Sequence, residues 1–385
     1  MMRYASWLTT AIQILSAYKG DIPFAAFIKS YFRQNKKHGS NDRRQISHLC
    51  YCYFRTGHAM KQSAIKEKIL AGLFLCSHES NELLQVFKPD WNEAINKSAG
   101  EKLPAINVRP EDIFPFHDEL SDEINNEEFI VSHFLQPDLF IRIRPGCKET
   151  VREKLDAAGC TYQLLNDTCI ALPNSTKIDA ILQLNKEAVV QDYSSQAVAS
   201  FFPARRGQSI RVWDCCAGSG GKSILLFDLF QTIQLTASDV RESILVNLKK
   251  RFTEAGLSGY KSFLTDLTAH SPKLPADSFN FILADVPCSG SGTWGRTPEQ
   301  MYFFERDEIE KYVALQKKII SNVIPSLQKD GYLLYITCSG FKKENEDVIR
   351  YICDNFFLKL VKQQMLKGYD KKADTMFAAL MVKPG

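Results

Sequence analysis

From about residue 193 onward, short and almost continuously apolar segments alternate with amphipathic stretches, and this alternation constrains the fold most. Strands of that composition are buried on both faces, which is typical of a parallel sheet with helices on both sides. The pattern predicts a doubly wound α/β domain over residues 193–385. Its strands are expected at 209–216, 233–240, 261–266, 279–288, 331–338, 357–363 and 376–383.

Two other patterns precede this domain. Residues 1–130 carry apolar side chains at helical spacing, such as Leu8, Ile12 and Leu15, and predict an all-helical domain. Residues 131–192 predict a small α+β module with the element order βαββαβ. Within that module we expect strands at 138–145 and 188–192, a strand pair between them, and helices at 148–159 and 179–187.

The net charge of +4 is small, but the charges are unevenly distributed. Residues 1–70 hold 12 Lys and Arg against 3 Asp and Glu, whereas residues 71–130 hold 4 against 13. The basic segment 27–45 can neutralise phosphates along a nucleic acid. It can equally be a solvated helical face beside an acidic neighbour, and charge alone does not separate these interpretations.

Composition excludes several classes of protein. The 11 cysteines are odd in number and scattered, which favours a reducing compartment over a disulfide framework. Cys50 and Cys52 lack further ligands at zinc spacing, so we expect no metal site. No apolar run approaches the roughly 18 residues that a membrane span needs, and the opening 20 residues resemble an amphipathic helix rather than a secretory signal. We expect a cytoplasmic enzyme that is monomeric.

Glycines and acids gather where the predicted strands end. The stretch DCCAGSGGKS (214–223) lies between a strand and a helix, where glycine lets the backbone approach a ligand. Asp239, Asp266 and Asp285 each end a later strand. Parallel strands open on one crevice, so Asp239 is placed to accept hydrogen bonds from ribose hydroxyls and Asp266 to contact an adenine amino group. The absence of a phosphate-loop motif favours an adenosine ligand without phosphates, such as S-adenosyl-L-methionine.

Two cysteines each stand at the end of an apolar strand of the same predicted sheet. Cys288 follows FNFILADVP and Cys338 follows GYLLYIT. Both thiols should therefore open on the crevice that holds the cofactor. Two thiols there indicate covalent chemistry on an electrophilic ring, although a single cysteine at the end of a strand is usually a buried structural residue.

These motifs, in this order, resemble those of the Sun/nucleolar-protein family of RNA 5-methylcytosine methyltransferases. The resemblance rests on DCCAGSGGKS, ASDV, TDLT, DVPCSGSGT, YITCSGFKKENE and QDYSSQAVA, and covers about residues 130–385. It implies a Rossmann-like class I methyltransferase sheet. Residues 131–192 are similar to the family's RRM-like module. Residues 1–130, notably NDRRQISHLCYCYFRTG (41–57), resemble the NusB-like RNA-binding domain of the bacterial ribosomal RNA branch.

The resemblance also assigns roles. It implies that Cys338 attacks carbon 6 of cytosine, after which carbon 5 takes the methyl group, and that Cys288 assists product release. Asp285 would hydrogen-bond the cytosine amino edge and ring nitrogen, and Lys222 would favour the thiolate. The residues expected to contact the cofactor are Cys216, Ala217, Gly218, Ser219, Gly220, Gly221, Lys222, Asp239, Asp266 and Asp285. The expected partner is RNA, most simply 16S ribosomal RNA.

The sequence departs from the family pattern at several positions. Gly218-Ser219 stands where Ala-Pro is usual, and Ile336 where Ser is common. The stretch TWGRTPE (293–299) carries Thr297 and Glu299 in a segment that is usually Arg-Asn-Pro-Asp, and Arg296 is still placed to touch the substrate backbone. None of these changes removes a reacting group.

Other functions compete with this one. DNA cytosine methyltransferases use the Pro-Cys cysteine itself as nucleophile, and amino-group methyltransferases usually carry an aromatic residue in the motif that reads DVPC here. The presence of Cys338 disfavours the first class and the DVPC motif the second. A transfer RNA cytosine-5 methyltransferase and a non-catalytic RNA-binding factor of ribosome assembly remain the alternatives. An assay of methyl transfer to RNA separates the last from an enzyme.

Overall fold

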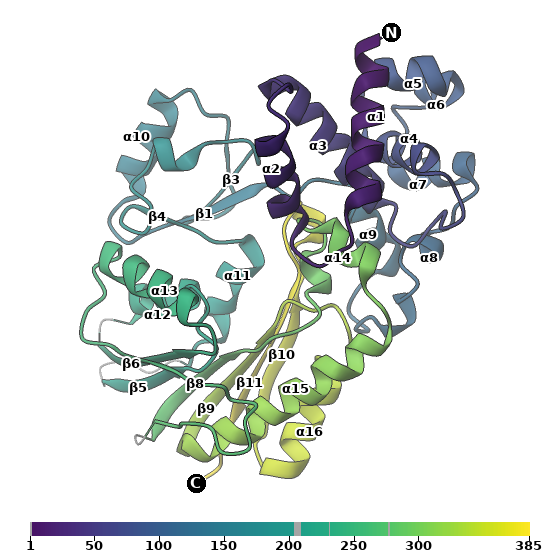
Figure 1. Ribbon diagram of the computed structural model, residues 1–385. Helices are drawn as coiled ribbons and strands as arrows, with labels where there is room; N and C mark the ends of the chain where they lie inside the picture. Colours follow the sequence, from purple (N-terminus) through teal and green to yellow (C-terminus); the bar gives the residue numbers. More distant parts are fainter. Residues whose placement is uncertain (1, 204–208, 231, 276–277) are drawn as a thin grey trace. The chain divides into compact units, whose positions relative to one another are not determined.

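The computed structural model describes residues 2–203, 209–230, 232–275 and 278–385 (Figure 1). The chain divides into two compact units. The helical unit runs to Leu120 and also contains Asn125–Gln136 and Thr293–Arg306. The α/β unit comprises Ser121–Ile124, Pro137–Gly292 and Asp307–Gly385. Within the described ranges, no helix has both the length and the apolar character needed to cross a membrane.

The helical unit is built from amphipathic helices around an aromatic and aliphatic core that includes Phe24, Phe54 and Phe74. Its helices are α1 (Met2–Ala17), α2 (Phe24–Gln34), α3 (Ser40–Arg55), α4 (Ile65–Cys76), α5 (Glu82–Phe87), α6 (Pro89–Glu93), α7 (Ala99–Lys102), α8 (Pro110–Ile113), α9 (Asn126–Ser132) and α14 (Pro298–Phe303).

Helix α14 joins this unit from far along the chain. The hydroxyls of Tyr302 and Tyr53 lie 2.7 Å apart, and the buried Glu299 accepts a hydrogen bond from the backbone N–H of Phe24 at 3.3 Å. The stretch that carries Thr297 and Glu299 therefore packs with the first hundred residues. The sequence did not predict that two segments so far apart in the chain pack together.

The α/β unit contains a seven-stranded sheet with the order β10-β11-β9-β8-β5-β6-β7. Strands β5 to β9 pair in parallel, and β11 joins β9 and β10 in antiparallel pairs. The strands are β5 (Ile210–Asp214), β6 (Ile233–Asp239), β7 (Lys261–Leu264), β8 (Phe279–Asp285), β9 (Leu327–Thr337), β10 (Lys359–Leu366) and β11 (Met376–Val382). The predicted doubly wound sheet is confirmed.

Helices cover both faces of this sheet, which explains why its central strands are apolar throughout. Alternate residues of the strands, such as Val212, Leu283 and Ile336, form one core with α12 (Gly221–Leu229) and α13 (Glu242–Glu254). The intervening residues are buried as well, for example Trp213 and Tyr335. Helices α15 (Asp307–Val323) and α16 (Glu346–Phe356) lie on the face of the sheet opposite to α12 and α13 (Figure 1).

A four-stranded antiparallel sheet with the order β2-β3-β1-β4 precedes the large sheet in the chain. Its elements are β1 (Leu139–Ile143), α10 (Lys148–Ala157), β2 (Gln163–Leu164), β3 (Cys169–Leu172) and β4 (Ala188–Val190), followed by α11 (Tyr193–Ala197). The helix expected at 179–187 is wrong, because only a 3₁₀ turn forms at Ile178–Ala180. Asn185 adopts a left-handed backbone with φ of 64°, which a helix cannot continue through.

A buried ion pair ties this small sheet to helix α12. Arg142 and Arg144 of β1 and its following turn each lie 2.5 Å from a carboxylate oxygen of Asp228. All three side chains are at most 10% exposed. Removing one partner of such a cluster leaves a buried charge uncompensated, so the small sheet and α12 hold a fixed arrangement.

The turn that leads into α12 requires glycine at one position. Gly220 has a φ of +80°, and a Cβ added there would lie 2.4 Å from the Phe252 ring. A side chain would therefore meet both backbone strain and a ring in the core. Gly221, the next residue, has neither restriction, since its Cβ would meet nothing within 4 Å.

We expect Gly220→Ala to lower the free energy of unfolding by about 1–3 kcal/mol. Gly221→Ala is the matched control and should stay within about 0.5 kcal/mol of the wild type. Denaturant unfolding of both variants measures the difference. Equal stabilities would contradict the conformation described for this turn.

Candidate functional site

Four polar strand ends meet at one edge of the large sheet. Strands β5, β6 and β8 end at Asp214, Asp239 and Asp285, and β9 ends at Thr337, directly before Cys338. The strands are parallel neighbours, in which Asp214 pairs with Ala237 and Leu283, and Asp285 with Ile336. Their carboxyl ends therefore open in the same direction.

The two cysteines predicted to act together lie in contact. The Sγ atoms of Cys288 and Cys338 are 3.2 Å apart, and the backbone N–H of Cys338 points to the Cys288 sulfur at 3.3 Å. Both residues are partly buried. The hydrogen bond with Cys338, together with burial, raises the pKa of the Cys288 thiol well above its ordinary value. Cys288 is therefore the thiol that holds its proton more firmly than an ordinary cysteine.

Lys222 and Asp285 form an ion pair beside the thiols. The Nζ atom of Lys222, in the first turn of α12, lies 2.6 Å from Oδ2 of Asp285. Burial opposes the charge on Lys222, but the carboxylate of Asp285 outweighs it and, with a smaller contribution from Cys338, raises the lysine pKa. The ammonium therefore stays charged near Cys338, which is the condition that favours a thiolate.

The glycine turn folds against the end of β6. The backbone N–H of Ala217 donates to the carbonyl of Ser238 at 2.9 Å, and that of Gly218 donates to Asp239 at 3.0 Å. The Ser219 hydroxyl accepts from Arg251 at 2.6 Å, which fixes the residue that replaces the usual proline. Of the other predicted residues of this turn, Cys216 is partly buried before Ala217, and Gly220 and Gly221 cap and begin α12.

Asp239 is arranged as an ionised acceptor. Its carboxylate accepts hydrogen bonds from the backbone and side chain of Arg241 at 2.9 and 3.1 Å. Burial opposes its charge, but the hydrogen bonds from Arg241 and Gly218 lower the pKa below its ordinary value. A buried carboxylate at the end of the second strand of a doubly wound sheet is suited to ribose hydroxyls.

Asp266 differs from the other strand-end acids. It is exposed, and its Oδ1 accepts from the backbone and hydroxyl of Thr268 at 2.8 and 2.6 Å. This is the local turn that aspartate forms with the residue two positions on. Its place beyond β7 agrees with the sequence, while its contact with adenine stays a prediction.

Sequence reasoning missed Asp214 as a site residue. The side chain is buried, and the Ser223 hydroxyl donates to Oδ2 at 2.6 Å. Among the described residues, Oδ1 is buried and has no hydrogen-bond partner. Burial raises the pKa of Asp214 to about 7. Its position could have identified it, because Asp214 ends a strand of the sheet as Asp239 and Asp285 do.

Sequence reasoning also missed a buried polar cluster behind the thiols. Glu344 is fully buried and accepts hydrogen bonds from the Ser289 backbone, the Ser339 hydroxyl and Gln316 at 2.7–2.9 Å. The sequence KENE (343–346) gives no local sign that its first glutamate is buried. The cluster fixes the two segments that carry the cysteines.

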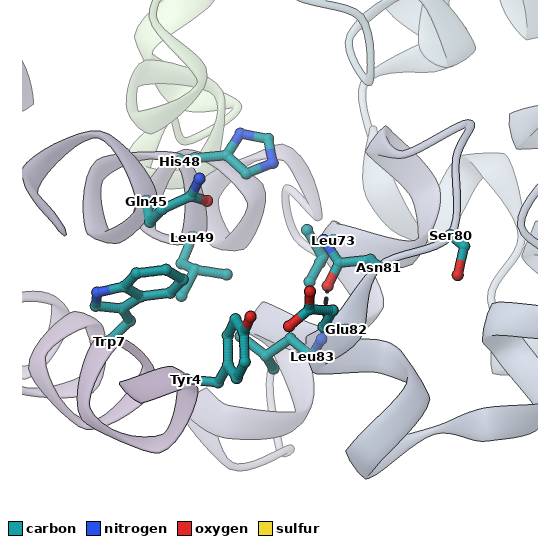
Figure 2. Close-up of a pocket in the computed structure, with 10 residues that line it drawn as sticks. All are labelled: Tyr4, Trp7, Gln45, His48, Leu49, Leu73, Ser80, Asn81, Glu82 and Leu83. Carbon is teal, nitrogen blue, oxygen red and sulfur yellow. Dashed lines mark hydrogen bonds between the residues drawn. The ribbon is translucent and has the colours of Figure 1, made fainter. Parts of the chain in front are cut away.

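The helical unit holds a separate cavity of about 280 Å³. Figure 2 shows it between α1, α3 and the start of α5, with Tyr4 and Trp7 on one side and Gln45 and His48 above them. It contains none of the residues predicted for catalysis. Arg296 also belongs to the helical unit, and its proposed contact with the substrate stays a prediction. In the part of the chain that the structure describes, no three His, Cys, Asp or Glu residues are grouped to hold a metal.

Comparisons with solved structures agree with the fold. The crystal structure of PH0851 superposes with a TM-score of 0.71 at 19% identity and covers 97% of both chains. NSun6 from Pyrococcus horikoshii, crystallised with SFG, gives a TM-score of 0.59 at 14% identity over 70% of this chain and 97% of its own. At these identities the likeness shows the fold.

Comparisons of sequence go further for one region. The probable ribosomal RNA small subunit methyltransferase B of Bacillus subtilis is 30% identical over 166 residues, or 43% of this chain and 37% of its own. The protein of the same name from Synechocystis is 30% identical over 239 residues, or 59% and 53%. The matches thus span about half or less of these relatives. Residues 203–379 match the model of the family described as 16S rRNA methyltransferase RsmB/F. This segment, which carries both cysteines and the glycine turn, is therefore similar to the methyltransferase domain of the RsmB/F family.

Proposed function

We propose that this protein transfers a methyl group from S-adenosyl-L-methionine to carbon 5 of a cytosine in RNA, most simply in 16S ribosomal RNA. One observation carries the proposal: two thiols lie 3.2 Å apart at the carboxyl ends of β8 and β9, beside a charged lysine–aspartate pair. A purely structural pair of cysteines does not require that ion pair. Covalent catalysis on a pyrimidine requires a nucleophile, a cation and a proton donor together.

The residues at the glycine turn fit this cofactor. Asp239 is an ionised, buried acceptor for ribose hydroxyls, and the buried Oδ1 of Asp214 is free, among the described residues, to accept from a donor group. The left-handed backbone at Gly218, where an added Cβ would meet nothing within 4 Å, lets a ligand approach the turn. SFG, an analogue of S-adenosylmethionine, accompanies NSun6, which supports the same choice. When bound, the cofactor supplies the methyl group.

Addition to the ring is the first task of the chain. Carbon 5 of cytosine is a poor nucleophile until a thiolate adds to carbon 6, which moves the electron pair of the double bond toward carbon 5. Lys222 stabilises the thiolate of Cys338 by its charge. As a carboxylate, Asp285 accepts from the cytosine amino group and favours a proton on the neighbouring ring nitrogen. A ring that carries this proton becomes neutral, rather than anionic, as the sulfur–carbon bond forms.

Release of the product is the second task. After methylation, carbon 5 carries both a methyl group and a proton, and a base must take that proton before the bond from carbon 6 to Cys338 can break. Cys288 is the nearest candidate, since its sulfur touches that of Cys338. Cys288 first passes its own proton to solvent, and the resulting thiolate, whose pKa is raised, then takes the carbon 5 proton.

RNA binding is assigned to the helical unit. Five exposed cations lie on α2, the loop after it and the first turns of α3: Lys29, Arg33, Lys36, Lys37 and Arg44. Such a surface suits contacts with a phosphate backbone. The names of the curated relatives support ribosomal RNA as the substrate, while transfer RNA stays the alternative. The monomeric state and the cytoplasmic location stay predictions.

The two cysteines should differ in a covalent trapping assay. Cys338→Ala removes the attacking group, so we expect no methylation and no covalent adduct with RNA. Cys288→Ala leaves the attack intact and impairs release, so a protein–RNA complex should accumulate as a slow band on a denaturing gel. The reverse pattern would exchange the two roles. Activity unaffected by both changes would reject the enzymatic proposal.

Asp214 should make the stability of the cofactor-free protein depend on pH. Its folded pKa of about 7 exceeds the ordinary 3.8, so the folded state keeps a proton that the unfolded chain has lost. The free energy of unfolding therefore falls as pH rises between these values. Asp214→Asn should reduce this loss between about pH 4 and about pH 7 in thermal unfolding, and should weaken cofactor binding in calorimetry. Asp266→Asn is the control and should leave the slope unchanged.

Neutralising the basic surface should weaken RNA binding. Replacing Lys36 and Lys37 by Gln should lower RNA affinity and reduce the salt dependence of binding by about 0.7 per lost phosphate contact. The control replaces Lys249 and Lys250, two exposed lysines of α13. Filter binding at several salt concentrations compares the two proteins. An equal effect of both pairs would assign RNA binding to net charge rather than to this surface.

A further inference from the structure

The segments that carry the two cysteines are held together from behind by one buried carboxylate. Glu344 is fully buried. Its Oε2 accepts from the backbone N–H of Ser289 at 2.9 Å, and its Oε1 accepts from the Ser339 hydroxyl at 2.7 Å. Ser289 follows Cys288 and Ser339 follows Cys338 in the chain. The carboxylate thus joins the residue after one thiol to the residue after the other.

Gln316 of helix α15 completes this arrangement. Its Nε2 donates to Glu344 at 2.7 Å and to the carbonyl of Pro287 at 3.1 Å. Cys288 is therefore held on both sides, through Pro287 and Ser289. Ser291 adds a second link between the segments, because its hydroxyl accepts from the Gly340 backbone at 2.8 Å.

Burying a carboxylate at this position costs free energy that packing alone does not require. Burial raises the pKa of Glu344, although hydrogen bonds from Ser289, Ser339 and Gln316 oppose that rise. Simple packing would be met by apolar side chains throughout such a cluster, whereas an apolar residue at position 344 alone would leave the donors of Ser289, Ser339 and Gln316 without an acceptor. A carboxylate has two oxygens, each able to accept from a different segment, and an apolar group has none.

We propose that Glu344 is a positioning residue, which sets the distance and orientation of Cys288 relative to Cys338 and touches neither substrate nor cofactor. The inference rests on the proposed function for its catalytic meaning, but the arrangement itself concerns only the protein. Attack by one thiol and proton removal by the other happen at adjacent ring carbons, so both sulfurs must stay within reach of the same ring. Misplacement by about 1 Å is enough to cost about a hundredfold in rate.

The test uses the full-length protein and phenylarsine oxide, whose arsenic forms two As–S bonds with a close pair of thiols and releases one water. The wild type should bind one equivalent across Cys288 and Cys338, as mass spectrometry of digests identifies. Cys288→Ser and Cys338→Ser should each abolish this equivalent. Glu344→Gln should weaken binding at least about tenfold, or ~1.4 kcal/mol. It keeps the shape of Glu344 but replaces one acceptor oxygen by a donor.

Glu346→Gln is the matched control. Glu346 lies two residues on and accepts from the Ser121 hydroxyl at 2.9 Å instead of from a cysteine-bearing segment. This variant should bind the arsenical as the wild type does. If Glu344→Gln does not fold, Gln316→Met serves in its place and should weaken binding in the same direction. Wild-type affinity in a folded Glu344→Gln or Gln316→Met protein would overturn the proposal.

Methylation kinetics separate this inference from the proposed function. If the proposed function holds, Glu344→Gln should lower kcat with little change in KM, because RNA and cofactor contacts are intact. If the variant loses arsenical binding and the wild type does not methylate RNA, the proposed function is rejected. The positioning role of Glu344 then still holds. An unchanged kcat beside weakened arsenical binding would overturn the catalytic part of the inference.

Discussion

The site depends on the parallel pairing of β5, β6, β8 and β9. In a parallel pair the carboxyl ends of the strands lie at the same edge, so Asp214, Asp239, Asp285 and Cys338 come together although more than a hundred residues separate the first from the last. An antiparallel β8 or β9 would send its cysteine to the opposite edge. Each further feature of the site refines this arrangement: the left-handed glycine turn, the Lys222–Asp285 pair, and the buried carboxylate behind the thiols.

The site has two halves, and the charged groups of each half suit a different task. The half at the glycine turn holds the carboxyl groups of Asp214 and Asp239, and acceptors of this kind suit a ligand rich in hydroxyl and amino groups. The thiol half pairs sulfur with an ammonium, which suits nucleophilic attack. Lys222 belongs to both, since it sits in the first turn of the helix that the glycine turn begins and reaches Asp285. The buried Arg142–Asp228 pair in turn anchors the other end of that helix to the small sheet.

Much of this could be predicted from the sequence because the signals are local. Apolar runs predicted the large sheet, and polar residues at their ends predicted Asp239, Asp285 and the two cysteines. Partners distant in sequence could not be predicted. Helix α14 joins the helical unit, and Glu344 accepts from residues 55 and 28 positions away in sequence. The helix expected at 179–187 failed for a local reason, since Asn185 takes a left-handed backbone that periodicity does not register.

The central claim is that Cys338 forms the covalent bond to a cytosine. RNA that contains 5-fluorocytosine tests it directly, because fluorine at carbon 5 cannot leave as a proton and the adduct with the enzyme persists. After incubation with this RNA and S-adenosyl-L-methionine, proteolysis and mass spectrometry locate the modified residue. We expect a methylated fluorocytidine nucleotide on Cys338. A nucleotide on Cys288, or no adduct from an enzyme that methylates ordinary RNA, would contradict it.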